Sequence, residues 1–366
     1  MARVVDASVL DSELNPEQAA AAKKIEGPML ILAGAGSGKT RAITYKIAHL
    51  VSYHNVESDR ILAVTFTNKA AREMTARIQK LLDAPLRFSW MGTFHSVCLR
   101  LLKKCLNTSQ ALQAFGGTWY DGNFSIYDDD DQKRLLKQIL KEDLGDDCDA
   151  AEIKRVHGAI SRYKNTVLYE FGSAVLQTPE VAMAHAEFAD EEKRARYYAE
   201  YQKRLRESNA MDFDDMLLYM NILVRDNTDI LSKYQDFFQY ILVDEYQDTN
   251  SLQAQFTDIL AAKHRNLMVV GDDFQCIYTW RGAQIENIME FPSRWPGCKI
   301  VKLERNYRSM PGVLNVANVV MADAESQFEK TLRPVRSGDG TKPTHCKVYD
   351  GRAQANEILS GIGRMR

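Results

Sequence analysis

Residues 29–40, MLILAGAGSGKT, decide the fold class of this chain. The stretch begins with an apolar run over residues 29–33, turns through glycines and leads into a helix-like segment over residues 40–51. Its loop, residues 33–40, nearly fits the phosphate-loop pattern G-x-x-x-x-G-K-[ST], with Ala33 in the place of the first glycine. The order of strand, glycine-rich loop and helix favours a phosphate-binding loop over an ordinary glycine-rich turn.

The glycines of this loop allow backbone N–H groups to turn toward phosphate oxygens at the beginning of a helix. Lys39 is expected to reach the β and γ phosphates of a nucleotide, and the Thr40 hydroxyl is expected to bind Mg²⁺. The predicted nucleotide-binding residues of the loop are Gly34, Ala35, Gly36, Ser37, Gly38, Lys39 and Thr40.

Two acidic residues follow another buried-strand pattern. Asp244 and Glu245 come directly after the apolar run at residues 241–243. An acidic pair alone is more often a solvated strand end, but a phosphate loop needs such a carboxylate on a neighbouring strand. Asp244 is therefore expected to hold Mg²⁺, directly or through water, and Glu245 to orient and deprotonate the attacking water.

Apolar strand patterns alternate with helical ones at residues 29–33, 61–66, 240–245 and 266–272. This alternation predicts an α/β fold with a parallel sheet covered by helices on both faces. Between residues 97 and 209 the strand signals vanish, which predicts an all-helical subdomain inserted at residues 99–207. The core domain then comprises residues 1–98 and 208–296. Strand patterns at 299–304 and 344–349, with helices from 311 and 352, predict an incomplete second core domain at residues 297–366.

The composition of the chain limits its possible partners and location. The net charge of −2 gives no hint of a polyanionic partner, although residues 69–104 are rich in Lys and Arg. No run approaches the roughly 20 apolar residues that cross a bilayer, and the N-terminus lacks a signal-peptide pattern, so no membrane contact and a cytoplasmic location are expected. The six cysteines are scattered and are interpreted as reduced thiols.

The motifs of this chain follow one another in the order found in a known family. They are LNPEQ (14–18), AGAGSGKT (33–40), TFTNKAAREM (65–74), GTFHS (92–96), MDFDDML (211–217), VDEYQDTN (243–250), VGDDFQCIYTWRGA (270–283) and LERNYRS (303–309). Over essentially its whole length the chain closely resembles the UvrD/Rep/PcrA group of superfamily 1 DNA helicases. The resemblance implies a RecA-like P-loop NTPase core, the helical insertion, the start of a second RecA-like domain, and ATP with Mg²⁺ as cofactors.

The resemblance also implies roles around the nucleotide. Gln18 would hydrogen-bond the adenine, while Arg41 and Tyr307 would sandwich it. Gln275 would sense the γ-phosphate, and Arg308 would reach it from the second core domain. The implied catalytic residues are Lys39, Asp244, Glu245, Gln275 and Arg308.

Single-stranded DNA and single/double-strand junctions are the implied partners. Tyr278, Trp280 and Arg281, together with Phe66, would offer flat faces and a cation to unpaired bases. An isolated phenylalanine or tryptophan such as Phe66 or Trp280 is more often a core residue than a DNA contact, and an isolated histidine such as His95 is more often a hydrogen-bonded loop residue. Their assignment to DNA therefore depends on their places within the motifs. The implied DNA contacts are Thr65, Phe66, Asn68, Thr93, His95, Tyr278, Trp280 and Arg281.

The chain departs from the family pattern at Phe274, Cys276 and Thr279, where relatives more often carry Asp, Ser and Arg; adjusted loop packing is expected there. The later motifs, including the one with a second catalytic arginine, are not found before Arg366. The sequence predicts the N-terminal part of an ATP-dependent 3′–5′ DNA helicase and translocase of repair and replication. The alternative is a nucleotide-gated DNA- or partner-binding module without autonomous unwinding. A P-loop kinase or GTPase would leave the DNA-facing motifs unexplained.

Overall fold

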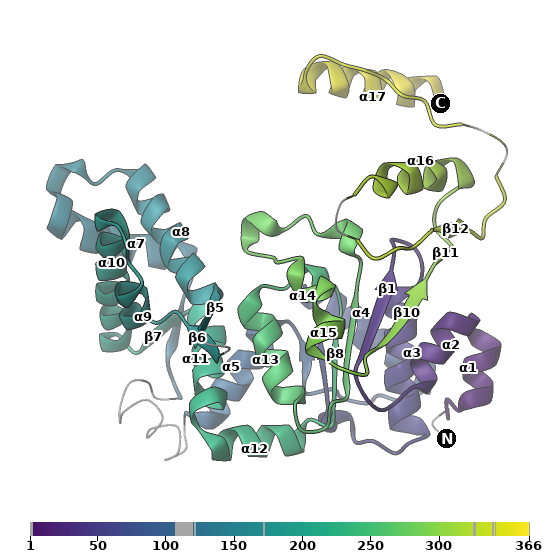
Figure 1. Cartoon of the computed structure of the whole chain (residues 1–366), viewed down its shortest axis with the longest axis horizontal. Coiled ribbons are helices and arrows are strands. Elements are labelled where there is room, and N and C mark those ends of the chain that lie inside the picture. Colours follow the sequence, from purple (N-terminus) through teal and green to yellow (C-terminus); the bar gives the residue numbers. More distant parts are fainter. Residues whose placement is uncertain are drawn as a thin grey trace.

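A six-stranded parallel sheet forms the centre of the computed structural model (Figure 1). The structure describes residues 3–106, 120, 122–170, 173–324, 327–338, 340 and 342–365. The strands lie in the order β10 (Lys299–Leu303), β1 (Met29–Ala33), β9 (Leu267–Gly271), β8 (Tyr240–Val243), β2 (Ile61–Val64) and β3 (Met91–Gly92). Every neighbouring pair is parallel, as the alternating strand and helix patterns predicted.

Both faces of the sheet are buried. Successive side chains of a strand point to opposite faces, and in β1 Leu30 and Leu32 join one apolar cluster while Met29, Ile31 and Ala33 join the other. The first of these clusters lies under α5 (Phe94–Cys105), α11 (Phe213–Asp226), α12 (Thr228–Phe237), α13 (Ser251–Ala261), α14 (Glu286–Met289) and α15 (Phe291–Arg294). The second lies under α1 (Ala7–Glu13), α2 (Pro16–Lys23), α3 (Lys39–Ser52) and α4 (Asn68–Leu82).

Capping residues and the spacing of apolar residues in the sequence account for where the helices begin and which side of each is buried. At the start of α4 the Thr67 hydroxyl accepts a hydrogen bond from the N–H of Ala70, which satisfies one of the free donors of the first turn. Met74, Ile78 and Leu81 recur at helical spacing along α4 and are buried against the sheet. The predicted helices at residues 40–51 and 69–82 are thus confirmed as α3 and α4.

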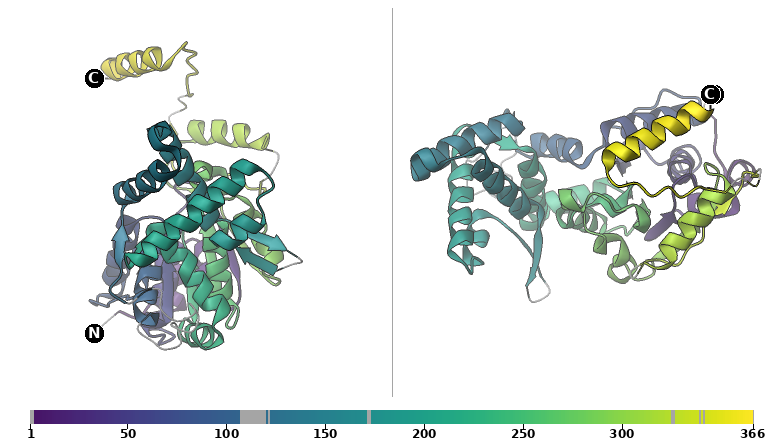
Figure 2. Two further views of the ribbon diagram at one scale, coloured as in Figure 1. Left: turned by 90° about the vertical axis from the view of Figure 1, so that its left-hand side faces the viewer. Right: turned by 90° about the horizontal axis from the view of Figure 1, so that it is seen from above.

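The inserted subdomain lies beside the sheet domain and has its own core (Figure 2). It contains α7 (Asp129–Leu144), α8 (Ala150–Asn165), α9 (Pro179–Ala184) and α10 (Ala189–Glu207). The expectation of an all-helical insertion is wrong in detail, because β5 (Val167–Glu170) and β6 (Ser173–Leu176) form a hairpin and β4 (Ser125–Tyr127) pairs with β7 (Ala210–Asp212). These strands are too short for a period-two pattern to stand out in the sequence.

A buried ion cluster joins the insertion to the sheet domain. The Nζ of Lys164, near the end of α8, lies 2.6 Å from Asp212 Oδ2 and 2.8 Å from Asp215 Oδ1 at the start of α11. The hydroxyl of Tyr201 also donates to Asp212 Oδ2 at 3.0 Å. Such a cluster specifies how α8 approaches the core, because an unpaired charge at this depth would be costly.

The C-terminal part differs from the sequence-based prediction. The strand at 299–303 does not open a second domain: β10 pairs with β1 along its whole length and completes the first sheet, so the predicted boundary at 296/297 lies too early. β11 (Arg305–Asn306) pairs with β12 (Arg333–Pro334), and α16 (Pro311–Ala322) lies between them in sequence. Residues 344–349 form no strand.

The final helix, α17 (Gly351–Met365), is present as predicted and lies apart from the sheet domain (Figure 1). Among the described residues, short 3₁₀ turns lie at Ser58–Arg60, Gly145–Asp147, Tyr246–Asp248, Asp273–Gln275 and Thr279–Arg281. In the described part of the chain, no helix is both long enough and apolar enough to cross a bilayer.

Candidate nucleotide and DNA site

The phosphate loop connects β1 to α3, as the sequence predicted. Gly36 and Gly38 have φ angles of +78° and +87°, in the left-handed region that favours glycine, and the N–H of Ser37 donates to Gly34 O at 3.2 Å. A Cβ on residue 36 would lie 2.5 Å from the Cβ of Arg308. The loop therefore presents backbone N–H groups at the beginning of α3, in a space too tight for side chains.

Lys39 and Glu245 meet at the end of this loop. The Lys39 Nζ lies 2.7 Å from Glu245 Oε2, and Asp244 lies buried beside them at the end of β8. Burial raises the pKa of Asp244 to about 7, the charge of Glu245 adds to this rise, and Lys39 opposes it. A carboxylate that is so poorly solvated favours a bound cation, and its oxygen atoms, like the hydroxyl of Thr40, are the kind of ligand that Mg²⁺ prefers.

The backbone of Glu245 is strained. Its φ of +52° and ψ of +48° lie in the left-handed region, which a residue with a Cβ seldom adopts. This conformation turns the chain directly after β8 into the 3₁₀ turn at Tyr246–Asp248 while the Glu245 carboxylate contacts Lys39. Strain of this kind, costing about 1–3 kcal/mol, persists where the surrounding structure imposes it and is concentrated at functional sites.

A buried glutamine connects the ends of β8 and β9. Gln247 Nε2 donates to Glu245 Oε2 at 3.0 Å, and Gln247 Oε1 accepts from the N–H of Asp272 at 3.0 Å. Asp272 Oδ2 in turn accepts from the Nε2 of Gln275, the predicted phosphate sensor. A continuous chain of polar contacts thus runs from Lys39 to Gln275. Gln247 lies within the quoted motif VDEYQDTN, yet nothing in the sequence marked it as the link.

Asp272 and its neighbour Asp273 hold a lysine from a distant part of the chain. Lys330 Nζ lies 2.7 Å from Asp272 Oδ1, contacts Asp273 Oδ1, and sits 3.7 Å from the centre of the Phe274 ring. The Lys330 side chain is only 1% exposed. It belongs to residues 327–338, here called the return segment, whose Leu332 side chain packs beside Gly34 of the phosphate loop. No sequence pattern predicted this contact.

The residues predicted to bind the adenine gather around the connection between α1 and α2. Gln18 Nε2 donates to Ser37 O at 3.0 Å, and its Oε1 accepts from the N–H of Asn15 at 3.3 Å. Arg41 donates to Glu13 O at 2.7 Å, and the Tyr307 hydroxyl accepts from Asn15 Nδ2 at 2.9 Å. The Gln18 amide keeps one N–H and one lone pair that these bonds do not use, which fits a base-reading role.

Arg308 is brought to the phosphate loop by its neighbours. Asn306 is buried, its Nδ2 donates to Ala35 O at 2.6 Å, and its Oδ1 accepts from the N–H groups of Arg308 and Ser309. The N–H of Tyr307 donates to Gly36 O at 2.9 Å. These bonds fix residues 306–308 against the loop and leave the Arg308 side chain exposed. Asn306 is a further residue that the sequence analysis did not single out.

The predicted DNA-stacking residues form one aromatic surface. The rings of Phe66 and Tyr278 stack with centroids 5.0 Å apart, and the rings of Tyr278 and Trp280 lie 6.1 Å apart. The Arg281 guanidinium lies 4.7 Å from the centre of the Trp280 ring. Trp280 is 73% exposed, so its ring face is open to a ligand. Trp280 is therefore not a core residue, which is what a tryptophan taken without its motif would more often be.

A cavity of about 980 Å³ collects most of the predicted DNA contacts. Its lining includes Thr65, Phe66, Thr93, His95, Tyr278, Trp280 and Arg281 from the sheet domain, and also residues of α8. Asn68 lies elsewhere, in a separate groove with Arg72, Gly92 and Ser96. Burial lowers the pKa of His95, against the opposing charges of Asp214 and Asp212, so His95 enters the cavity as a neutral hydrogen-bonding group at neutral pH.

A parallel sheet with a phosphate loop after β1 and a carboxylate pair after β8 defines a P-loop nucleotide-binding domain, and the exposed aromatic surface beside it suits a nucleic acid. Comparison with known families identifies which family of P-loop proteins this is. The chain belongs to the UvrD/REP helicase family, whose N-terminal domain model matches residues 14–296.

Curated relatives agree with the family assignment. The ATP-dependent DNA helicase PcrA of Staphylococcus epidermidis (strain RP62A) is 40% identical over 355 residues, which cover 97% of this chain and 46% of that protein. The ATP-dependent DNA helicase PcrA of Staphylococcus aureus (strain Mu50) is 41% identical over the same length, again with 46% of the relative covered. The chain thus spans about half the length of the curated relatives it matches.

Proposed function

We propose that this chain is the ATP-binding and single-strand-binding part of an ATP-dependent DNA helicase that translocates 3′ to 5′. The observation that carries the proposal is the polar connection from Lys39 through Glu245, Gln247 and Asp272 to Gln275. It begins at the phosphate loop and ends on the short loop that bears Tyr278 and Trp280. The connection supports the proposal because it joins the proposed ATP site to the proposed base-stacking surface.

The contacts suggest how the chain's residues respond to the nucleotide. The ion pair between Lys39 and Glu245 has to open when Lys39 turns to the phosphates, which frees the Glu245 carboxylate to accept a proton from water. Mg²⁺, held by Thr40 and Asp244, would neutralise phosphate charge. Gln247 donates to the same Glu245 oxygen, so movement of that carboxylate changes the position of Gln247. Through the hydrogen bonds of Gln247 and Asp272, this movement would shift Gln275.

The later motif with a second catalytic arginine is not in this sequence, so the chain by itself is expected to bind ATP and single-stranded DNA but to hydrolyse ATP slowly. Unwinding needs two core domains that close on ATP and reopen after hydrolysis. Junction preference and a role in repair or replication belong to the same proposal and follow from the family resemblance. A cytoplasmic location is proposed with them.

Steady-state ATP hydrolysis by the 366-residue chain, with and without single-stranded DNA, tests the proposal. Lys39→Ala and Glu245→Gln are the variants to compare. DNA-stimulated turnover that both substitutions abolish would support an ATPase coupled to DNA. Nucleotide binding that depends on Lys39, without any turnover, would mean that the nucleotide site is intact but needs the arginine of the later motif for hydrolysis. If the chain binds no ATP at all, the assignment of the site is wrong.

A further inference from the structure

We propose that one face of α8, in the inserted subdomain, binds the sugar-phosphate backbone of the single strand whose bases stack on Tyr278 and Trp280. The residues of this face are Lys154, His157, Gly158, Ser161 and Arg162, here called the α8 wall. The inference rests on the proposed function, because it assigns the second side of the same DNA site.

The α8 wall is a single helical face turned toward the cavity. Its members recur at intervals of three and four residues, the spacing that brings side chains to one side of a helix. All of them line the 980 Å³ cavity together with Phe66, Tyr278 and Trp280. The cavity thus has an aromatic side built from the sheet domain and a polar side built from the insertion.

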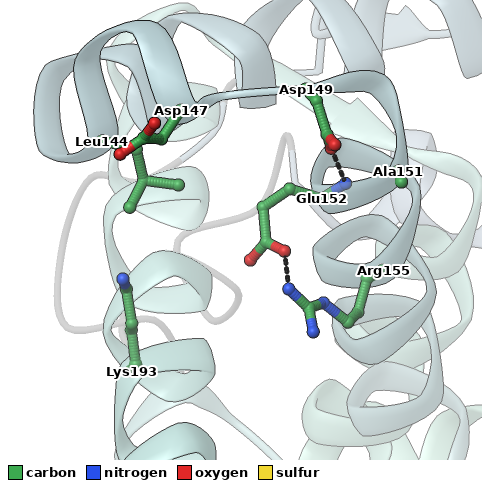
Figure 3. A pocket seen from close by; sticks show the side chains of 7 residues that line it. All are labelled: Leu144, Asp147, Asp149, Ala151, Glu152, Arg155 and Lys193. Carbon is green, nitrogen blue, oxygen red and sulfur yellow. Dashed lines mark hydrogen bonds and ion pairs between the residues drawn. The ribbon is translucent and has the colours of Figure 1, made fainter.

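The cations of the α8 wall are available to a ligand. Lys154 and Arg162 are exposed, and within the described parts of the chain neither forms an ion pair. Arg155 provides the contrast on the same helix, because it is paired with Glu152 and faces a different hollow, lined also by Lys193 (Figure 3). Unpaired basic residues are thus found on the face that meets the aromatic surface.

The acidic residues around the α8 wall are already engaged. Asp129 is ion-paired with Lys133 and lies 3.8 Å from His157 Nε2. Asp214 Oδ2 accepts a hydrogen bond from the Ser161 hydroxyl at 2.6 Å. Asp244, Glu245 and Asp248 also line the cavity, and they belong to the stretch that contacts Lys39 of the phosphate loop. The wall itself therefore offers the positive charges of Lys154 and Arg162.

A single strand of nucleic acid fits these two sides. Its bases have flat faces for Tyr278 and Trp280, and its phosphates need cations on the side away from the stack. Lys154 and Arg162 are two helical turns apart, about 12 Å along the axis, so they can contact different phosphates of one strand. Gly158 lies between them and has no side chain, so the wall does not project where the strand would pass. A Cβ added there would lie 3.7 Å from the Arg162 guanidinium.

The test is the salt dependence of binding to a fluorescein-labelled oligo-dT, measured by anisotropy with the whole chain. The double substitution Lys154→Gln and Arg162→Gln is compared with Arg155→Gln, which changes a residue of the other hollow, and with Trp280→Ala on the aromatic side. Each lost phosphate contact lowers the slope of log K against log salt by about 0.7, so the double variant should lose about 1.4. The affinity should fall on the order of 60-fold at 50 mM salt and about tenfold at 200 mM.

The outcomes separate this inference from the proposed function. Unchanged affinity and slope in the double variant, with weaker binding by Trp280→Ala, would overturn the α8 wall and leave the proposed function standing. A loss of slope about half as large in Arg155→Gln would also overturn it, because one lost charge against two would then explain the effect through overall charge alone. An unmodified chain that binds no oligo-dT would refute the proposed DNA site and the α8 wall together. All three basic positions are exposed, so matching melting curves can verify that the variants fold.

Discussion

Replacing Lys330 by Met should destabilise the chain more than any ordinary lysine substitution. Lys330 is 1% exposed at its side chain, and its partners Asp272 and Asp273 are 3% and 0% exposed. Removing the cation leaves two carboxylates buried side by side without their counter-ion. Breaking a buried ion pair in this way typically costs about 3–5 kcal/mol, a large fraction of the roughly 5–15 kcal/mol that stabilises a folded domain.

Urea unfolding followed by circular dichroism measures the loss, and hydrogen exchange of the return segment shows where the structure opens. Lys302→Met is the matched control, because the Lys302 side chain also reaches this segment, at Glu329 O, but is exposed. The control should change stability by less than about 0.5 kcal/mol. Phe328, whose N–H donates to Asp273 Oδ2 at 2.8 Å, should exchange faster in Lys330→Met alone.

A second substitution tests the stated cause. Adding Asp273→Asn to Lys330→Met removes one of the two stranded charges and keeps an acceptor for the N–H of Phe328. The double variant should therefore recover at least about 1 kcal/mol of the loss, as expected for coupled neighbours. A loss under about 1 kcal/mol in Lys330→Met, or no recovery in the double variant, would refute the reasoning.

Three further predictions follow from other contacts. Burial lowers the pKa of the Lys46 side chain to about 7, and the positive charge of Lys24 lowers it further. Between pH 7 and 10 the unfolded chain therefore binds one more proton than the folded chain, and the free energy of unfolding rises with pH. Lys46→Met should remove that slope, up to about 1.4 kcal/mol per pH unit in urea unfolding at pH 7 to 9, and an unchanged slope would contradict the assignment. Gln247→Ala should leave ATP binding intact but abolish the effect of a non-hydrolysable ATP analogue on oligo-dT affinity; a preserved effect would mean that Gln247 is not the link. Thr67→Ala should cost about 1 kcal/mol by removing the cap of α4, and a loss near zero in thermal unfolding would show that water replaces the cap.

Much of the core and part of the site could be predicted from short stretches of sequence. The phosphate loop, the pair Asp244 and Glu245, and the loop with Gln275 each follow a strand, and parallel strands bring such ends together at one edge of the sheet. The contact between Lys39 and Glu245 follows from this rule although 206 positions separate the two residues. Exposed aromatic residues such as Trp280 were assigned through their motif, since nothing local distinguishes a stacking surface from a core residue.

The sequence by itself therefore determined the parallel sheet, the nucleotide loop and the polar residues at its edge, because each depends on a local period or spacing. Only the tertiary structure decided that β10 completes the first sheet, that Lys330 pairs with Asp272 and Asp273, and that α8 faces the aromatic surface. The local sequence of a strand does not show which strand it will pair with. The local sequence around a lysine likewise does not show which carboxylates will surround it in the fold. Those choices depend on burial and charge summed over the whole folded chain.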